Sequence, residues 1–429
     1  MSWPRRHHWQ AEGLRLRRQP LAWLAFSTLF LVLLASAIAV GLDARAWRAA
    51  AAQDAAVFTA QLAQAAQRLQ PPGPANAIAT YQLGRGELGG TRMPVRAGLA
   101  LDVQRLDVLP ARLKASLDSR HVDARDPGPL RNPLLTESGL PGLPAMVALL
   151  VPLVALLLCA GWLQEEREQG RLGLLRVQST HGMAPLLIAA LGWRLLGLWA
   201  VTAAATLPAL ALDPGASLPV AMQWLGALAA FCALWVLLGG LLSCLPGSGA
   251  TAMLAALGLW LALTFAVPAG LLLLAEQQAP TPSRLQSIVA IRAAQHDSED
   301  REQALAQAWY AAHPEIAAQL PAVWPASFAV RALDQDLALE PLSVERAESR
   351  IAQAELLSRW SWLSPGLALV LIGEVLAGTD VHSHVRYLAQ VEAFEQRWRD
   401  FLLPAVMARQ GLSAAQLAAL PRPGPAAAP

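Results

Sequence analysis

The chain has 429 residues, of which 55% are hydrophobic and 15% charged, and its mean hydropathy is +0.37. This composition is too apolar for an ordinary soluble protein and too polar for membrane spans alone, so it predicts membrane helices joined to substantial soluble parts. The net charge of +2 gives no indication of a nucleic-acid partner. The three cysteines lie in or beside apolar runs, which excludes disulfides and thiolate metal clusters from the soluble parts.

The N-terminal region predicts a cytosolic interfacial helix followed by a first span. Residues 1–20 carry five arginines, one acidic residue and a few large apolar side chains, a pattern typical of a helix lying on a membrane surface. Residues 21–42 carry no charge and are long enough to cross the hydrocarbon layer. The run is too long for the apolar core of a signal peptide, so we interpret it as an uncleaved anchor.

Residues 43–142 form a first soluble insert, which we place in the periplasm. Its Ala- and Gln-rich part, Asp43 to Gln70, predicts a helix continuous with the first span and ended by the prolines that follow. Residues 99–109 alternate enough to predict a short strand. Four further apolar runs then predict spans at 143–163, 186–212, 220–242 and 250–275.

A charged segment at 164–185 separates the second span from the third. Residues 165–180 read EEREQGRLGLLRVQST, and charges of this density cannot enter hydrocarbon cheaply. The leucines after Gly170 predict a short amphipathic helix. From the residues alone, a solvated connector and a docking face for a cytosolic partner are equally good interpretations.

The placement of arginines predicts the orientation of the chain. Basic residues are concentrated before the first span and in the 164–185 segment, whereas the 213–219 link has none. Short cytoplasmic loops carry the excess of basic residues, so the N-terminus and the charged segment are expected in the cytoplasm. Both inserts then lie on the periplasmic side of a bacterial inner membrane.

The second insert, residues 276–429, is expected to be mostly helical. Ser283 is a candidate N-cap, and the periodicity predicts helices at 284–295, 299–312 and 342–358, with a disordered tail at 421–429. Each insert alone is short of a continuous apolar core. We therefore expect the two inserts to pack together into one periplasmic domain.

Residues 360–376 are either a sixth span or an amphipathic helix. Their strongly apolar part, Leu367 to Ile372, is short, and Glu374 follows it. A carboxylate near the centre of a span costs about 2.5–3.5 kcal/mol on insertion scales, about as much as these apolar residues return. We predict five spans, and hence a mainly α, polytopic membrane protein with a mostly helical periplasmic domain built from two inserts.

The order of these features resembles the permease subunit of an ABC-2 type transporter. The stretch EREQG-x-L after the second span is similar to that superfamily's coupling helix, although Arg171 stands where Thr or Ser is common. The chain is also similar to a branch with large periplasmic inserts at Arg131-Asn132-Pro133-Leu134, Pro280-Thr281-Pro282-Ser283, His313-Pro314-Glu315, Leu376-Ala377-Gly378-Thr379-Asp380 and Gln396-Arg397-Trp398-Arg399-Asp400-Phe401.

The resemblance implies an ATP-driven transport function, most often export, in which this chain has no catalytic role. ATP and Mg²⁺ would bind a separate ATPase dimer, and a second permease subunit, identical or homologous, would complete the pore. The chain itself holds no G-x-x-x-x-G-K-[ST] phosphate loop. The residues expected to contact the ATPase are Glu165, Glu166, Arg167, Glu168, Gly170, Arg171 and Leu172.

For Arg194 and for residues 380–384 we favour a structural interpretation over a functional one. Arg194, inside the third span, is either a residue of the translocation path or an interface pair, or an arginine that snorkels to the cytoplasmic surface beside Trp193; we favour snorkelling. Asp380, His382 and His384 are better read as a helix start than as metal ligands.

The alternative function is a membrane-anchored periplasmic scaffold or sensor with a permease-like shell.

Overall fold

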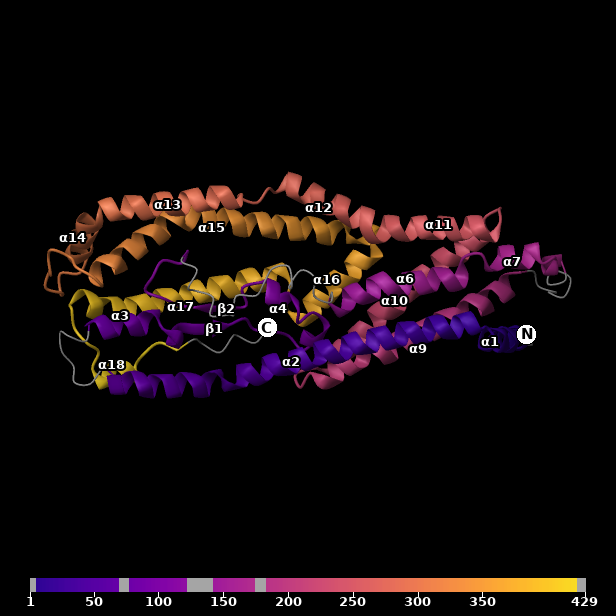
Figure 1. The fold of residues 1–429 in the computed structure, drawn as a ribbon, viewed down its shortest axis with the longest axis horizontal. Coiled ribbons are helices and arrows are strands. Elements are labelled where there is room, and N and C mark those ends of the chain that lie inside the picture. The colour runs from indigo at the N-terminus through magenta and orange to yellow at the C-terminus, as the bar shows by residue number, and fades with distance from the viewer. Residues whose placement is uncertain (1–4, 69–76, 122–141, 174–182, 423–429) are drawn as a thin grey trace.

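The computed structural model describes residues 5–68, 77–121, 142–173 and 183–422. The molecule is elongated, with a helical bundle towards one end and the two inserts at the other (Figure 1). The bundle contains parts or all of α2 (Pro20–Arg68), α6 (Leu143–Cys159), α9 (Ala184–Leu212), α10 (Leu218–Cys244), α11 (Gly249–Leu261) and α12 (Val267–Gln278). A π-helical turn, η5 (Ala262–Ala266), joins α11 to α12.

Six helical segments among the described residues are long and apolar enough to cross a membrane. Five of them correspond to the predicted spans. The sixth, Pro365–Met407, joins α16 (Pro365–Ala377) to α17 (Val381–Met407) and contains residues 365–376 of the stretch in dispute. The chain is therefore a mainly α, polytopic membrane protein, as the sequence predicts.

The helix α2 runs from the bundle into the insert region without a break. It contains 49 residues, which corresponds to roughly 74 Å of α-helix. The predicted continuity between the first span and the Asp43 to Gln70 helix is confirmed as far as Arg68. The prolines expected to end it lie outside the described residues.

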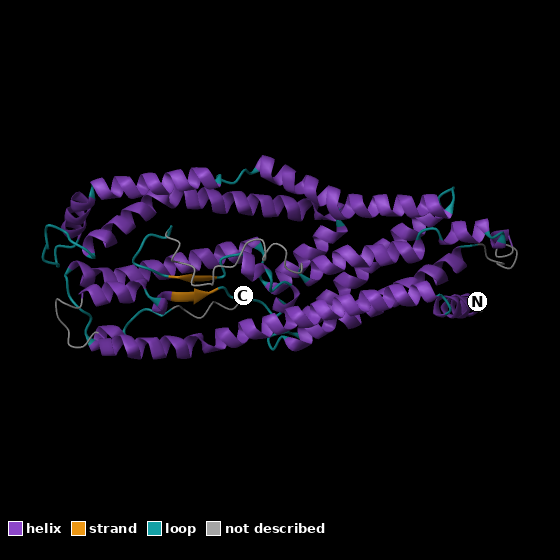
Figure 2. Cartoon of the chain, viewed as in Figure 1, coloured by secondary structure: helices purple, strands orange, loops and turns teal. Residues whose placement is uncertain are grey.

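The inserts are mostly helical, as Figure 2 shows. The first contributes α3 (Ala77–Arg85), α4 (Arg105–Val108) and a two-stranded sheet; the second contributes α13 (Arg284–Asp300), α14 (Glu302–Ala312), α15 (Ala326–Trp360), α17 and α18 (Ala414–Ala418). The predicted helices at 284–295 and 299–312 are confirmed. The third, expected at 342–358, begins sixteen residues earlier, at Ala326, and runs through Pro341 to Trp360.

The strand predicted at 99–109 is wrong. That stretch forms a 3₁₀ turn, η3 (Leu99–Leu101), and the short helix α4. The strands are instead β1 (Gly90–Arg92) and β2 (Arg112–Lys114), which pair antiparallel with Thr91 opposite Leu113. The three residues of η3 are fully buried against α2, α9 and α16, so their apolar character reflects burial between helices and not the alternation of a strand.

The two inserts share one hydrophobic core, as expected from the sequence. Tyr81 and Leu117 of the first insert lie in a cluster with Tyr310, Trp398 and Leu402 of the second, and each of these side chains is buried. The indole Nε1 of Trp398 donates to the carbonyl oxygen of Gly84 at 3.0 Å. We refer to the packed inserts below as the insert domain.

The close approach at Gly84 gives a first prediction. A Cβ atom at this position would lie 2.4 Å from Leu117 Cδ1 and 3.2 Å from Leu402 Cδ1. Gly84→Val should therefore lower the unfolding free energy of the insert domain by about 1–3 kcal/mol, the usual cost of overpacking. Thermal unfolding followed by tryptophan fluorescence would measure the loss. An unchanged midpoint would mean that α3 does not pack on Leu117 as described.

Candidate functional site

The charged segment after α6 lies at the end of the molecule opposite the insert domain (Figure 1). Gly161, with a φ of +83°, turns the chain out of α6 and into the short helix α7 (Trp162–Glu168). The N-terminal helix α1 (Arg5–Arg17) lies at the same end. The helix predicted after Gly170 is described only for its first turn, 171–173; residues 174–182 lie outside the described part of the chain.

The residues expected to contact an ATPase are not all on the surface. Glu166 and Leu172 are 2% and 8% exposed. The side chains that face solvent are those of the remaining charged positions, and Gly170 is exposed with them: Glu165, Arg167, Glu168, Gly170 and Arg171. Leu172 packs inward, so it does not offer an apolar side chain to a partner at this end of the molecule.

Glu166 is held between two arginines. Arg15 of α1 donates to its Oε1 atom, and Arg171 donates to Oε2 at 2.9 Å and to Oε1 at 3.0 Å. A carboxylate buried to this degree requires such partners, because an unpaired charge away from water is costly. Glu166 thus joins α7 to α1 within the chain.

Arg194 of α9 is a further buried arginine close to α7. Its side chain is 3% exposed and donates to the carbonyl oxygens of Leu158 and Ala190, each at 2.9 Å. Glu12 of α1 lies 3.8 Å away. The prediction that Arg194 snorkels to the surface is wrong: α9 begins at Ala184, more than two turns earlier, and α1 covers the guanidinium.

Trp162 provides the surface on which both cations lie. The guanidinium carbons of Arg15 and Arg194 are each 5.5 Å from the centre of its ring system, within cation–π range. A second aromatic contact ties α1 to α9: Trp193 Nε1 donates to the carbonyl oxygen of Trp9 at 2.7 Å. We call the group Glu12, Arg15, Trp162, Glu166 and Arg194 the inner charge cluster.

Burial changes the pKa of the Glu12 carboxyl. Loss of solvent raises the pKa of this carboxyl above its ordinary value, and the nearby Arg15 and Arg194 only partly offset that effect. Sequence reasoning missed Glu12 and Arg15 because the basic N-terminal segment was interpreted as facing lipid. The single acid among five arginines was the available signal, since a lone carboxylate in a basic helix suggests an internal partner.

The helix α7 is also tied to the neighbouring spans. Gln164 Nε2 donates to the carbonyl oxygens of Leu242 and Leu245 at 3.0 and 3.1 Å, at the end of α10. Glu168 Oε1 accepts the backbone N–H of Gly249 at 2.8 Å, at the first residue of α11. Its negative charge there complements the positive end of the α11 dipole. Together with the inner charge cluster, these bonds connect α7 to α1, α9, α10 and α11.

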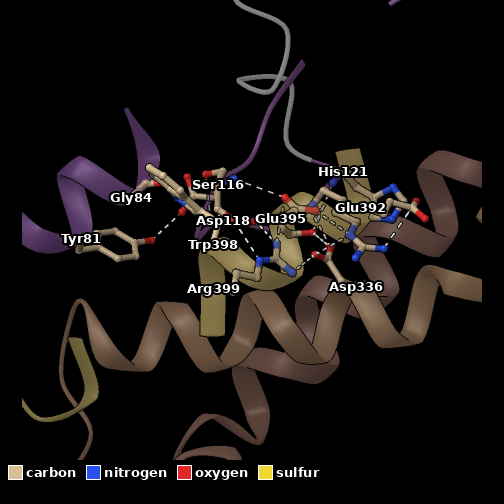
Figure 3. Close-up of polar contacts among 12 residues, drawn as sticks. Tyr81, Gly84, Ser116, Asp118, His121, Asp336, Glu392, Glu395, Trp398 and Arg399 are labelled. Atoms are coloured by element: carbon tan, nitrogen blue, oxygen red, sulfur yellow. Dashed lines mark hydrogen bonds and ion pairs between the residues drawn. The ribbon is translucent and has the colours of Figure 1, made fainter. Parts of the chain in front are cut away.

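A second buried charge network lies in the insert domain (Figure 3). Arg399 of α17, 3% exposed, lies 2.7 Å from Asp336 of α15 and donates to the carbonyl oxygens of Ser116 and Asp118 at 2.9 and 2.6 Å. Glu395, fully buried, accepts Arg120 Nε at 2.8 Å. The contacts of Ser116, Asp118 and Arg120 join the first insert to the second, and the Arg399–Asp336 pair joins α17 to α15 within the second, which makes this network a structural connection.

The expected helix start at Asp380 is confirmed. Asp380 is the N-cap of α17, and its Oδ1 atom accepts the backbone N–H of Ser383 at 3.0 Å. His384 is 2% exposed and lies in the insert interior, so it does not form a surface pair with His382.

Comparison with known proteins assigns a family model to part of the chain. Residues 284–422, which comprise the second insert from α13 to α18, match a domain of unknown function, DUF3526. No curated protein and no solved structure matches the chain. The match falls on the insert domain and leaves the α7 end of the bundle without an assignment.

Proposed function

We propose that this chain is the membrane-spanning subunit of an ATP-driven transporter of the ABC-2 type, acting in export across a bacterial inner membrane. In this proposal the α7 end faces the cytoplasm and the insert domain the periplasm. ATP and Mg²⁺ bind a separate ATPase dimer, and a second permease subunit, identical or homologous, completes the assembly. The chain itself performs no chemical step.

The observation that carries the proposal is the bonding of α7. A connector between two spans needs few contacts, but α7 is hydrogen-bonded to α1, α10 and α11 and makes a cation–π contact with Arg194 of α9, while its charged face stays in water. A force on the exposed residues Glu165 and Arg167 would therefore act on α1 and on the spans together. Such an arrangement suits a segment through which a cytosolic motor moves a membrane bundle.

The proposal assigns different roles to the exposed and the buried residues. Glu165, Arg167, Gly170 and the outer face of Arg171 meet the ATPase. Glu168 also contacts the ATPase, while its Oε1 atom accepts the backbone N–H of Gly249 at the start of α11. Glu166, Leu172 and Arg194 do not touch the partner; they transmit its movement to α1 and α9.

The test is a double variant, Glu165→Ala with Arg167→Ala. Both side chains are exposed, so the thermal midpoint should stay unchanged, since surface substitutions usually alter stability by less than about 0.5 kcal/mol. Affinity for the ATPase that copurifies from native membranes should fall at least tenfold, or about 1.4 kcal/mol. The matched control is Glu348→Ala with Arg397→Ala, two exposed charges in the insert domain.

The alternative function is a membrane-anchored scaffold or sensor. The shared core of the inserts and their uninterrupted connection through α2 favour a domain that reports binding on the periplasmic side. If no ATPase copurifies, or if the α7 variant binds it and stimulates it like the unmodified protein, the transport proposal fails and the scaffold remains.

A further inference from the structure

The helix α15 continues past the outer end of the last span. Ser349 Oγ donates to the carbonyl oxygen of Pro280 at 3.0 Å, and Gln353 Nε2 donates to that of Ala279 at 2.8 Å. These contacts place Ser349 and Gln353 level with the residues that follow α12. Because α15 runs antiparallel to α12, its last two turns, down to Trp360, lie beside the apolar part of that span.

The chain then turns back at about half the height of the span. After the 3₁₀ turn η6 (Ser361–Leu363), Ser364 Oγ donates to the carbonyl oxygen of Leu263 at 2.8 Å. Leu263 lies in the π-helical turn, fifteen residues before the end of α12, or roughly 22 Å of helix. Ser364 is therefore near the middle of the apolar run 249–275, not at its edge.

The helix α16 leads the chain back out. It packs antiparallel on α6: a Cβ at Gly366 would lie 3.3 Å from Ala148 Cβ, and one at Gly373 would lie 2.4 Å from Pro144 Cγ. At its end, the carbonyl oxygens of Leu376 and Ala377 accept the backbone N–H groups of Gly98 and Arg96 at 3.1 and 2.9 Å. Both partners belong to the first insert, so α16 ends on the side where α15 began.

The dimensions of α16 exclude a complete crossing. Its 13 residues span roughly 20 Å, against about 30 Å of hydrocarbon. The next helix, α17, cannot supply the missing length, because Phe394, Trp398 and Leu402 on it belong to the core of the insert domain. Glu374, the residue that made a sixth span costly, is 5% exposed and pairs with Arg105 of the first insert.

We propose that the end of α15, η6 and α16 form a re-entrant hairpin that enters the membrane from the side of the insert domain and returns to the same side. Its backbone N–H and C=O groups are hydrogen-bonded within the helices and at the Ser364 N-cap, and the hairpin packs on α6 and η5. Backbone that lies at membrane depth without crossing needs such partners. The hairpin presents Trp360 and Trp362, 41% and 69% exposed, to the lipid of that leaflet. The described residues then cross the membrane five times.

The test uses single cysteines in a background in which the three native cysteines are replaced. Glu348→Cys and His382→Cys lie before and after the hairpin, and Glu165→Cys marks the opposite end. A membrane-impermeant maleimide should label the first two from one side of sealed vesicles and Glu165→Cys from the other. Labelling of His382→Cys from the same side as Glu165→Cys would show a sixth crossing and overturn the proposal.

The depth of the turn is measured with a nitroxide on Trp362→Cys and, in a second variant, on Ile372→Cys, which is also exposed on α16. Collision of the nitroxide with molecular oxygen should exceed collision with a water-soluble nickel chelate several-fold at both sites, and the ratio should reverse at Glu348→Cys. A turn that lies in water would give the nickel-dominated ratio at Trp362→Cys. That result would also overturn the proposal.

Discussion

Replacing Arg399 with methionine is expected to lower the unfolding free energy of the insert domain by about 3–5 kcal/mol, the usual cost of removing one partner from a buried ion pair. Arg399 is 3% exposed and contacts four acceptors: Asp336, Glu395 and the carbonyl oxygens of Ser116 and Asp118. Methionine fills much of the same volume but removes the guanidinium that contacts both Asp336 and Glu395, and the two carboxylates then share Arg120.

Arg397→Met is the matched control, because it makes the same chemical change two residues away on the same helix. Arg397 is exposed, and its guanidinium carbon lies 5.9 Å from the centre of the Phe394 ring, so its replacement should cost less than about 1 kcal/mol. Thermal unfolding and protease resistance of the insert domain would both be measured. Equal midpoints for the two variants would show that the Arg399 network adds nothing to the joining of the inserts.

Glu166→Gln should have the second largest effect, at the other end of the molecule. The amide keeps the shape of the side chain but removes the charge that holds Arg15 and Arg171, at a cost of about 2–3 kcal/mol. The value lies below that of a fully buried pair because the Arg171 side chain is 49% exposed. With α1 loosened, trypsin should cleave faster at Arg17 and Arg18, which lie where α1 meets α2.

Two further variants make the Glu166 prediction specific. Glu165→Gln changes the adjacent, exposed carboxylate and should leave both stability and cleavage unchanged. Arg15→Met combined with Glu166→Gln should cost less than the sum of the single changes by 1 kcal/mol or more, since the two side chains are in contact. Additive effects would mean that Glu166 does not hold α1.

The sequence predicted the spans well because each is a long apolar run, charge-free except for Arg194 in the third, whose character depends on its own residues. The predictions that failed concerned partners distant in sequence. A position near the start of the third span, beside Trp193, predicts that Arg194 snorkels to the membrane surface, whereas its partner Glu12 lies on a different helix and the guanidinium is buried. Leu172 was expected to be exposed for the same reason: burial is decided by the fold, not by local periodicity.

The stretch at 360–376 also depends on partners that are distant in sequence. Its short apolar core and Glu374 argue against a full span, and the sequence offers only two options, a crossing helix or an amphipathic helix outside the membrane. A helix that enters and returns was not predictable, because its stability depends on α6, on the π-helical turn and on Arg105. The neutralising partner of Glu374 lies 269 residues earlier in the chain.

Because α2 is one continuous helix, a movement of its span would also move the part that extends into the insert domain. From Asp43 to Arg68 it extends beyond the span by roughly 39 Å. If this rod tilts by about 10° around its embedded part, its end at Arg68 moves by roughly 7 Å, together with the insert core that packs on Phe58 and Leu62. Arg48, near the base of this rod, donates to Asp213 in the turn between α9 and α10, so the rod is tied to the bundle there, and a small rotation of the bundle would become a larger displacement at the tip.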